Sequence, residues 1–140
     1  MPQPVNLLLV EDDPVDVMNV RRAIARAEFD CKLTVVADGP DALELLRRPA
    51  TSDFPADRRV VLLDLNMPTM TGVEVLAEIR DDPALKPLPV VILSTSDQPR
   101  DRDAVFQLNA AGYLVKPPDP GAFADIISAI YTYWSQSLTN

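Results

Sequence analysis

Five short apolar segments, separated by helical patterns, are the feature that most constrains how this chain can fold. They lie at residues 5–10, 32–36, 60–63, 89–93 and 113–115. Most are apolar at consecutive positions, which is typical of strands buried on both faces in a parallel sheet. Because crossovers between parallel strands are right-handed, the intervening helices are expected to cover both faces. The pattern predicts an α/β fold, a doubly wound five-stranded parallel sheet in (βα)5 order.

The residues between these segments are typical of turns and helix starts, which supports the same assignment of strands and helices. Asp13 followed by Pro14 is typical of a helix start, and Asp38-Gly39-Pro40 indicates a turn. Residues 49–58 are polar and bounded by proline, so we expect a long connection or a small insertion there. The 140 residues fit one domain of ordinary size, spanning 1–140.

Charge and composition argue against several classes of function. The net charge of −8 argues against nucleic acid and anionic membrane surfaces as partners. The sequence contains no histidine, which excludes histidine-based nucleophilic triads and a phosphohistidine on this chain. No apolar run is long enough to span a membrane and no signal-peptide pattern opens the sequence, so we expect a cytoplasmic protein. The single cysteine, Cys31, is expected to pack at a strand start.

Polar side chains of related chemistry follow four of the predicted strands. In a doubly wound sheet the functional crevice lies beyond the carboxyl ends of the strands, so these side chains are expected to meet at one edge. The first segment is followed by Glu11, Asp12 and Asp13, and the third by Asp64 and Asn66. The fourth is followed by Ser94 and the fifth by Lys116. Acids, a hydroxyl and an amine are therefore expected to gather at this edge.

Clustered acids at one edge predict a bound cation. Two carboxylates about 4 Å apart repel by about 4 kcal/mol at an effective dielectric of about 20. Oxygen ligands with open positions suit Mg²⁺, which we expect Glu11, Asp12 and Asp64 to hold. Acids, Mg²⁺, a lysine and a hydroxyl are the groups that phosphoryl transfer uses. Asp64 ends a central strand and is the expected nucleophile, becoming an acyl phosphate.

Four short motifs occur in order along the chain: LLLVEDD, LLDLNMP, ILSTS and YLVKP. Together they resemble the receiver domain of bacterial two-component response regulators, in particular the single-domain, CheY-like kind. The resemblance covers nearly the whole chain. The loops and the aromatic C-terminal segment are similar to those of the small response regulators that partner bacterial phytochromes.

The resemblance implies a role for each acid at the predicted edge. Asp64 is the implied phosphoacceptor. Asp12 is implied to bind Mg²⁺ directly and Glu11 largely through water, while Asn66 lends its backbone carbonyl to the ion. Mg²⁺ is thus the implied cofactor.

The same resemblance implies how the phosphoryl group is held and sensed. Ser94 and Lys116 are implied to contact it, so that Asp64, Ser94 and Lys116 form the catalytic set. Tyr113 is the implied aromatic switch, which turns inward when Ser94 is drawn towards the phosphoryl group. Pro117 follows Lys116 and is expected to sit on a cis peptide bond.

Partners are implied as well. A sensor histidine kinase, with a bacterial phytochrome as the candidate, would donate the phosphoryl group, and output would pass to an unidentified downstream protein. The last helical pattern is apolar nearly all round near its end, which indicates a covered surface. We expect a homodimer through this helix, with Tyr131, Tyr133 and Trp134 at the interface.

Several alternatives stay open at the level of sequence. A metal site shifted by one residue would use Asp12 and Asp13 in place of Glu11 and Asp12, although Asp13 is well placed to cap a helix. Tyr113 could simply pack, and the tyrosines of the last helix could lie scattered on a monomer. An aspartate-nucleophile phosphatase of the dehalogenase type uses the same groups, but has an acid where this chain has Asn66. A third class is an interaction module that is never phosphorylated.

Overall fold

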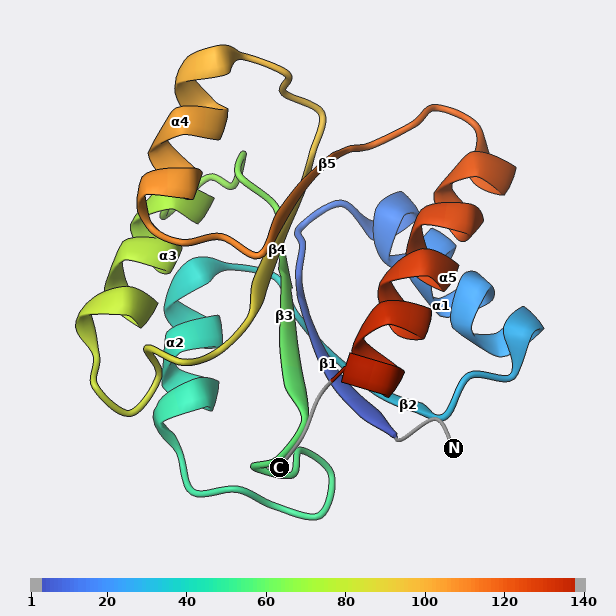
Figure 1. Ribbon diagram of the computed structural model, residues 1–140, viewed down its shortest axis with the longest axis horizontal. Coiled ribbons are helices and arrows are strands. Elements are labelled where there is room, and N and C mark those ends of the chain that lie inside the picture. The colour runs from blue at the N-terminus through green and yellow to red at the C-terminus, as the bar shows by residue number, and fades with distance from the viewer. Residues whose placement is uncertain (1–3, 138–140) are drawn as a thin grey trace.

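A computed structural model describes residues 4–137, which form a parallel sheet with helices on both of its faces (Figure 1). The strands are β1 (Val5–Val10), β2 (Cys31–Val36), β3 (Arg59–Leu63), β4 (Val90–Ser94) and β5 (Gly112–Val115). The helices are α1 (Pro14–Ala27), α2 (Gly39–Arg47), α3 (Gly72–Asp81), α4 (Pro99–Gln107) and α5 (Pro120–Ser137). The strands pair in parallel in the order β2-β1-β3-β4-β5, which confirms the predicted doubly wound (βα)5 fold.

Alternate side chains of the central strands enter two separate cores. In β1, Leu8 and Val10 pack with residues of α2, α3 and α4, whereas Leu7 and Leu9 pack with residues of α1 and α5. Figure 1 shows the same division, with α1 and α5 on one side of the sheet and the other three helices opposite. Burying one such side chain contributes about 1.5–3 kcal/mol. Consecutive apolar residues are therefore what a strand covered on both faces requires.

Side-chain caps mark where helices begin at the carboxyl edge of the sheet, as at the starts of α1 and α3. Asp13 accepts a hydrogen bond from the Val15 N–H at 2.9 Å, and Pro14 is the first residue of α1. At the start of α3, the Thr71 hydroxyl accepts from the Glu74 N–H and the Glu74 carboxylate accepts from the Thr71 N–H. This reciprocal capping box satisfies two donors that the helix start leaves free.

Two arginines at the junction of the polar connection at 49–58 with β3 bind backbone carbonyls. Arg59 donates to the carbonyls of Phe54 and Pro55, and its guanidinium lies 3.9 Å from the centroid of the Phe54 ring. The connection is therefore folded back on its own end, and β3 begins at Arg59, one residue before the apolar run.

Arg58 ties this connection to the C-terminal helix. It is 8% exposed and adopts a left-handed backbone conformation, with a φ of 54°. Its Nε donates to the Pro4 carbonyl at 2.6 Å, and its Nη2 donates to the carbonyls of Trp134 and Ser135 at 3.4 and 3.2 Å. A helix C-terminus leaves such carbonyls free and favours a cation. The connection thus holds the end of α5 in place.

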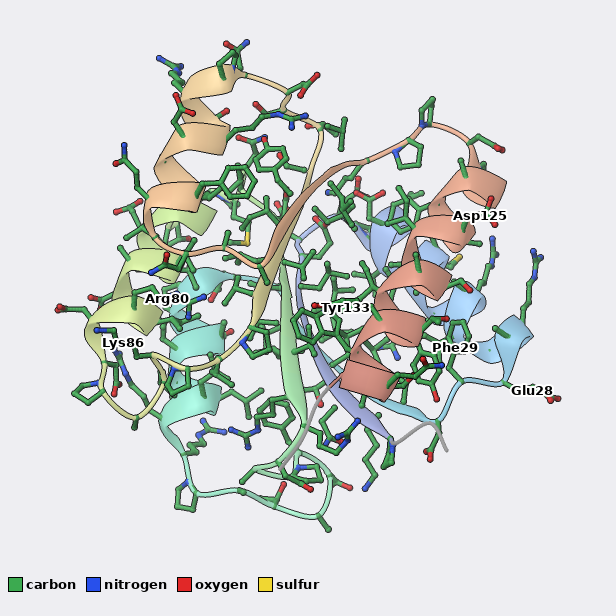
Figure 2. All side chains as sticks on the ribbon, viewed as in Figure 1. Glu28, Phe29, Arg80, Lys86, Asp125 and Tyr133 are labelled. Carbon is green, nitrogen blue, oxygen red and sulfur yellow. The ribbon has the colours of Figure 1, made fainter. Side chains whose placement is uncertain are left out.

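Arg80, near the end of α3, has a similar role on the opposite face (Figure 2). Its guanidinium donates to the carbonyls of Lys86, Leu88, Leu108 and Asn109 at 2.8 to 3.0 Å. One side chain therefore joins the loop before β4 to the segment after α4.

Three further expectations concern Cys31, the peptide bond before Pro117 and membrane-spanning segments. Cys31 begins β2 as predicted, and burial raises the pKa of its thiol to about 11. The described residues contain no cis peptide bond, so the expected cis bond before Pro117 is wrong. The pairing of β5 with β4 extends to Lys116, whose N–H donates to the Ser94 carbonyl at 2.7 Å. Within residues 4–137, no helix has both the length and the apolar character to cross a membrane.

Candidate functional site

Strand register brings the predicted acids together. Val10 of β1 pairs with Leu63 of β3, so Glu11 and Asp64 follow paired residues at the carboxyl edge of the sheet. The Asp64 N–H donates to the Val10 carbonyl at 3.1 Å and extends this pairing. Both acids are buried, Glu11 at 3% and Asp64 at 5% exposure. The acid at the end of the buried strand therefore meets a second buried acid.

Glu11, Asp12 and Asp64 form a cluster suited to a divalent cation. Each offers one carboxylate oxygen, and these three oxygens lie within 4.8 Å of one another. Asp12 is exposed while the other two are buried, so the cluster opens to solvent on one side. Carboxylates at this spacing repel one another, and a set of hard oxygen donors with an open side is what Mg²⁺ or Mn²⁺ binds. The residues present fit a divalent metal ion.

Asp13 lies beside this cluster in a different role. Its carboxylate caps α1 through the Val15 N–H, and its own N–H donates to Glu11 Oε2 at 3.2 Å. Asp13 thus starts the helix and orients Glu11. The geometry favours Glu11 and Asp12, with Asp64, over the register shifted by one residue.

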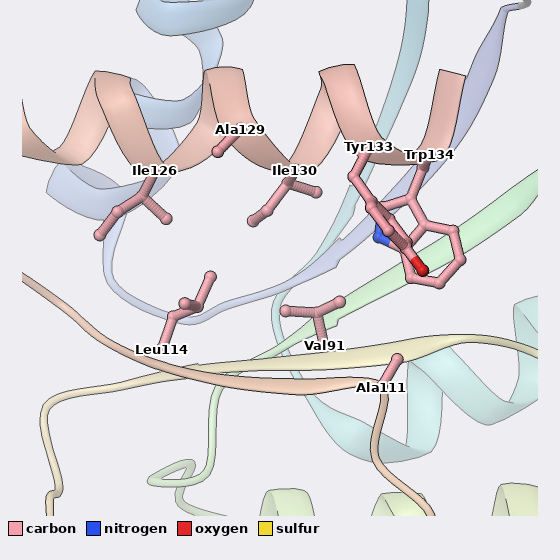
Figure 3. Close-up of a pocket in the computed structure, with 8 residues that line it drawn as sticks. All are labelled: Val91, Ala111, Leu114, Ile126, Ala129, Ile130, Tyr133 and Trp134. Carbon is pink, nitrogen blue, oxygen red and sulfur yellow. The ribbon is translucent and has the colours of Figure 1, made fainter. Parts of the chain in front are cut away.

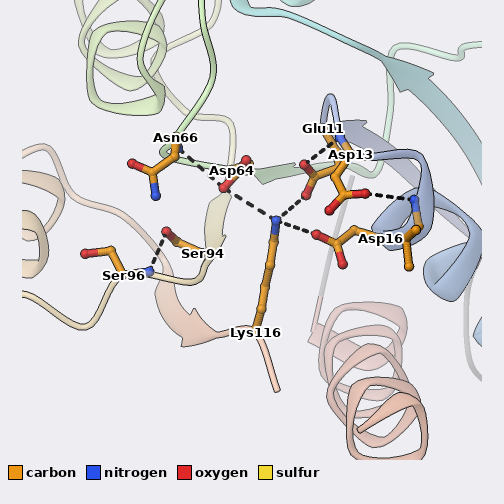
Figure 4. Close-up of polar contacts among 9 residues, drawn as sticks. Glu11, Asp13, Asp16, Asp64, Asn66, Ser94, Ser96 and Lys116 are labelled. Atoms are coloured by element: carbon orange, nitrogen blue, oxygen red, sulfur yellow. Dashed lines mark hydrogen bonds and ion pairs between the residues drawn. The ribbon is translucent and has the colours of Figure 1, made fainter. Parts of the chain in front are cut away.

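Lys116 lies among the acids (Figure 4). Its Nζ is 2.5 Å from Glu11 Oε1, 2.7 Å from Asp16 Oδ2 and 3.6 Å from Asp64 Oδ1. The lysine side chain is 7% exposed, so these charges interact with little screening by water. Sequence reasoning did not find Asp16, because an acid in the first turn of a helix is common there for its effect on the helix dipole. The signal that could have found Asp16 is its position in the first turn of α1, the turn that Asp13 caps beside the acid cluster.

Burial and ion pairing shift the pKa values of these groups. Burial raises the pKa of Glu11 to about 7, against the opposing effect of the hydrogen bond from Lys116. Burial also raises the pKa of Asp64, against the opposing charge of Lys116. For Lys116, burial lowers the pKa, but the hydrogen bonds to Asp16 and Glu11 outweigh this and raise it above its ordinary value. The lysine stays charged, while ionising the buried acids costs free energy that a bound cation would offset.

Ser94 and Asn66 lie near Asp64 at the ends of neighbouring strands (Figure 4). Ser94 ends β4 and is fully buried, and its Oγ accepts from the Ser96 N–H at 3.1 Å. The Asn66 N–H is 3.4 Å from Asp64 Oδ1, while the residue itself is exposed. The side chains that follow four different strands therefore meet at one edge of the sheet.

Tyr113 connects β5 to the loop after β4. Its hydroxyl donates to the Ser96 carbonyl at 2.6 Å, and the residue is partly buried. Arg102 of α4 places its guanidinium 4.9 Å from the centroid of the Tyr113 ring and also pairs with Asp97. Tyr113 therefore does more than pack, because it binds the loop that also contacts the Ser94 hydroxyl.

Gly72 allows α3 to begin directly against the backbone of Asp64. A Cβ at this position would lie 2.3 Å from the Asp64 carbonyl oxygen and 2.8 Å from Leu65 Cα. The Gly72 N–H donates to the Leu65 carbonyl at 3.0 Å. The close approach that only glycine permits thus helps to place the chain that carries Asp64.

The three aromatic residues predicted at a dimer interface have different surroundings. Tyr131 stacks on Phe29 with ring centroids 4.2 Å apart, and its hydroxyl accepts from the Asp30 N–H. Tyr133 is 61% exposed and Trp134 is partly buried. Both line an apolar groove of about 660 Å³ between α5 and the β4–β5 side of the sheet (Figure 3). The remaining lining residues are Val91, Ala111, Leu114, Ile126, Ala129 and Ile130.

Comparison with known proteins finds a family and relatives that share this architecture. The model of the response regulator receiver domain family matches residues 7–128, a span that contains every polar residue of the carboxyl edge. Response regulator Rcp1 of Synechocystis sp. is 33% identical over 136 residues, which cover 97% of this chain and 92% of Rcp1.

Two solved structures have the same fold over nearly their whole length. The Mn²⁺-bound form of response regulator Rcp1 has a TM-score of 0.84 and 33% identity, covering 97% of this chain and 98% of that one. The phosphorylated cyanobacterial phytochrome response regulator RcpA has a TM-score of 0.85 and 34% identity, covering 97% of each chain. With five parallel strands, an acid cluster and a buried lysine at one edge, the chain belongs to the family of response regulator receiver domains.

Proposed function

We propose that this receiver domain accepts a phosphoryl group on Asp64 from a sensor histidine kinase, at a site that holds Mg²⁺. The observation that carries the proposal is the position of Asp64, which is buried between a second acid and Lys116 at the carboxyl edge. Membership of the receiver family supports a phosphoacceptor role, and the similar regulator RcpA has been solved in a phosphorylated form.

The transfer forms one bond to phosphorus and breaks another. An Asp64 carboxylate oxygen attacks phosphorus, the bond from phosphorus to the donor histidine nitrogen breaks, and the histidine leaves with the electron pair. The Lys116 ammonium, 3.6 Å from Asp64 Oδ1, stabilises charge on one phosphoryl oxygen. The Ser94 hydroxyl accepts a hydrogen bond from the Ser96 N–H, so its own O–H is free to donate a hydrogen bond to another phosphoryl oxygen. The domain would catalyse its own phosphorylation and dephosphorylation and no other reaction.

Glu11, Asp12 and Asp64 would hold the metal ion, together with the Asn66 carbonyl. When bound, Mg²⁺ supplies positive charge that offsets the charge of the phosphoryl oxygens. Both carboxylate oxygens of Glu11 already have partners, because Oε1 pairs with Lys116 and Oε2 accepts from the Asp13 N–H. This supports a contact of Glu11 with the ion largely through water.

Phosphorylation would be sensed through Ser94 and Tyr113. The Ser96 N–H donates to Ser94, and the Ser96 carbonyl accepts from Tyr113, so one residue of the loop contacts both. A shift of Ser94 towards the phosphoryl group would pull on this loop and change what Tyr113 can bind. The modified state would therefore differ at β5 and the adjacent helices, where a partner protein can detect it.

The description of RcpA as a phytochrome response regulator supports a phytochrome as the kinase of this chain. Output would pass by contact to a downstream protein that remains to be identified. We infer that the proposed phosphotransfer takes place in the cytoplasm.

A homodimer through α5 completes the proposal. Tyr133 is exposed beside the apolar groove that it lines with Trp134, which is a surface suited to a second copy of the chain. Tyr131 would lie at the edge of this interface, because its ring is already stacked on Phe29.

Intact-mass spectrometry after incubation with acetyl phosphate and Mg²⁺ tests the phosphoacceptor role. The native protein should gain the mass of one phosphoryl group, and Asp64→Asn should gain none. Asp38→Asn is the matched control, because Asn retains the cap that Asp38 provides to α2. An unmodified native protein would favour an interaction module that is never phosphorylated. Steady turnover of a generic phosphate ester, lost in Asp64→Asn, would indicate a phosphatase.

A further inference from the structure

The ammonium group of Lys116 is shared unequally among three acids. Its contacts of 2.5 Å to Glu11 Oε1 and 2.7 Å to Asp16 Oδ2 are hydrogen-bond distances. At 3.6 Å, its contact to Asp64 Oδ1 is an ion pair too long for a hydrogen bond. An ammonium has three N–H donors. Glu11 accepts one of these donors and Asp16 pairs with the ammonium at short range, which leaves donor capacity on the side of Asp64.

Asp16 differs from the other two acids in its position. It comes from the first turn of α1, and its side chain is 17% exposed. It is not a member of the cluster of Glu11, Asp12 and Asp64 that fits a metal ion. Metal binding therefore does not explain why a third carboxylate approaches the lysine.

We propose that Asp16 is a positioning residue that holds the Lys116 ammonium off the Asp64 carboxylate, at a distance that leaves room for a phosphoryl group. This inference rests on the proposed function. A phosphoryl group on Asp64 brings further oxygens towards the lysine, and an N–H on that side can bind one of them with little movement of the side chain. Donors held in place before the reaction stabilise developing charge without reorganisation.

Loss of Asp16 would change where the lysine rests. With that short contact gone, Glu11 and Asp64 remain as partners, and a buried ammonium closes to hydrogen-bond distance with a carboxylate. Lys116 would then bind the Asp64 carboxylate and compete for the oxygens that attack phosphorus. Because Asp16 acts through Lys116, its effect must disappear when the lysine is removed.

A double-mutant cycle tests this dependence. Native protein, Asp16→Asn, Lys116→Met and the double variant are phosphorylated by acetyl phosphate at saturating Mg²⁺, and the rates are followed by intact-mass spectrometry. In this reaction Asp64 attacks phosphorus, the phosphorus–oxygen bond to the acetyl group breaks, and acetate leaves with the electron pair. Asp16→Asn should slow phosphorylation about tenfold in the native background and less than about twofold in the Lys116→Met background.

Asp41→Asn is the matched control for this cycle. Like Asp16 it is an acid in the first turn of a helix, but it lies on α2, is exposed and has no part in the proposed site, so its replacement removes one negative charge elsewhere. This control should keep the native rate, which shows that the Asp16 effect is not a general effect of charge. Should Asp16→Asn fold poorly, Asp16→Ser is measured in its place.

Nuclear magnetic resonance can measure how fast the Lys116 ammonium protons exchange with solvent. This rate would not change if Asp16 had only a structural role. The Lys116 protons should exchange with solvent slowly in the native protein and faster in Asp16→Asn, and Asp16→Glu should restore slow exchange. A native phosphorylation rate in Asp16→Asn, or an equal loss in both backgrounds, would overturn the inference. A native protein that takes up no phosphoryl group would overturn the proposed function instead.

Discussion

The Tyr113 hydroxyl donates a hydrogen bond to the Ser96 carbonyl across 2.6 Å and ties β5 to the loop that follows β4. Arg102 lies over the same ring and pairs with Asp97 of that loop. The Ser96 N–H in turn donates to Ser94. The position of Tyr113 therefore depends on a loop that contacts the proposed phosphoryl site.

Replacing Tyr113 by Phe removes this hydrogen bond and keeps the ring. We expect the free energy of unfolding, measured by urea denaturation, to fall by about 1 kcal/mol. Tyr133→Phe is the matched control, because Tyr133 is 61% exposed, and its effect should stay within about 0.5 kcal/mol. Equal values for the two variants would show that the bond to Ser96 contributes nothing to stability.

Removal of the Arg58 guanidinium should destabilise the protein strongly. Arg58→Met leaves the carbonyls of Pro4, Trp134 and Ser135 without this donor, and we expect a loss of about 2–4 kcal/mol. Arg48→Met is the control, because the Arg48 side chain is 60% exposed and its ion pair with Glu44 should contribute less than about 1 kcal/mol. Chemical denaturation measures both, and a loss for Arg58→Met no larger than that for Arg48→Met would contradict this account.

The buried acids predict an unusual pH dependence without metal. Burial raises the pKa of Glu11 from 4.5 to about 7, so protonated Glu11 stabilises the fold fully below 4.5, and this contribution is lost as the pH rises to about 7. The raised pKa of Asp64 acts in the same direction. The lowered pKa values of Glu74 and Asp82 act in the opposite direction, but below 4.5, because their ordinary values are 4.5 and 3.8.

Denaturation midpoints at about pH 5 and about pH 8 measure this effect. With chelator present the midpoint should be lower at the higher pH, and saturating Mg²⁺ should raise it most at the higher pH, where the carboxylates are ionised. Glu11→Gln cannot titrate and should flatten the metal-free slope. A metal-free midpoint that rises steadily across this range would contradict the prediction.

Exposure of Tyr133 beside the apolar groove predicts self-association. Light scattering on the native protein should give the mass of a dimer, and Tyr133→Ser should shift it towards the monomer. Phe106→Ser is the control, since Phe106 is a similarly exposed aromatic residue on α4, at 50%. A monomeric mass for the native protein at high concentration would remove the dimer.

Much of the fold could be predicted because its determinants are local. Consecutive apolar residues in β1, β3 and β4 indicate burial on both faces, and Asp13-Pro14 marks the start of α1. The site followed from topology, since the carboxyl ends of parallel strands share an edge. Glu11, Asp64 and Lys116 were found in this way, and the structure brings all three together.

The residues that were missed depend on contacts between distant segments. Asp16 meets Lys116 only after α1 and β5 have taken their places around the sheet. Arg58 appeared to be an ordinary polar residue of a connection, but its donors reach the end of α5. The stacking of Tyr131 on Phe29 likewise depends on how α5 lies against the end of α1.

The central claim, that Asp64 accepts the phosphoryl group at a site that holds Mg²⁺, is tested most directly by locating the phosphorylated residue. After transfer from a phosphorylated histidine kinase in Mg²⁺, borohydride reduces an acyl phosphate to the alcohol, and peptide mapping locates the resulting homoserine. The account predicts homoserine at Asp64 alone, and none when Mg²⁺ is withheld. Homoserine at Asp12 or at any aspartate other than Asp64, or equal labelling in the presence of chelator, would contradict it.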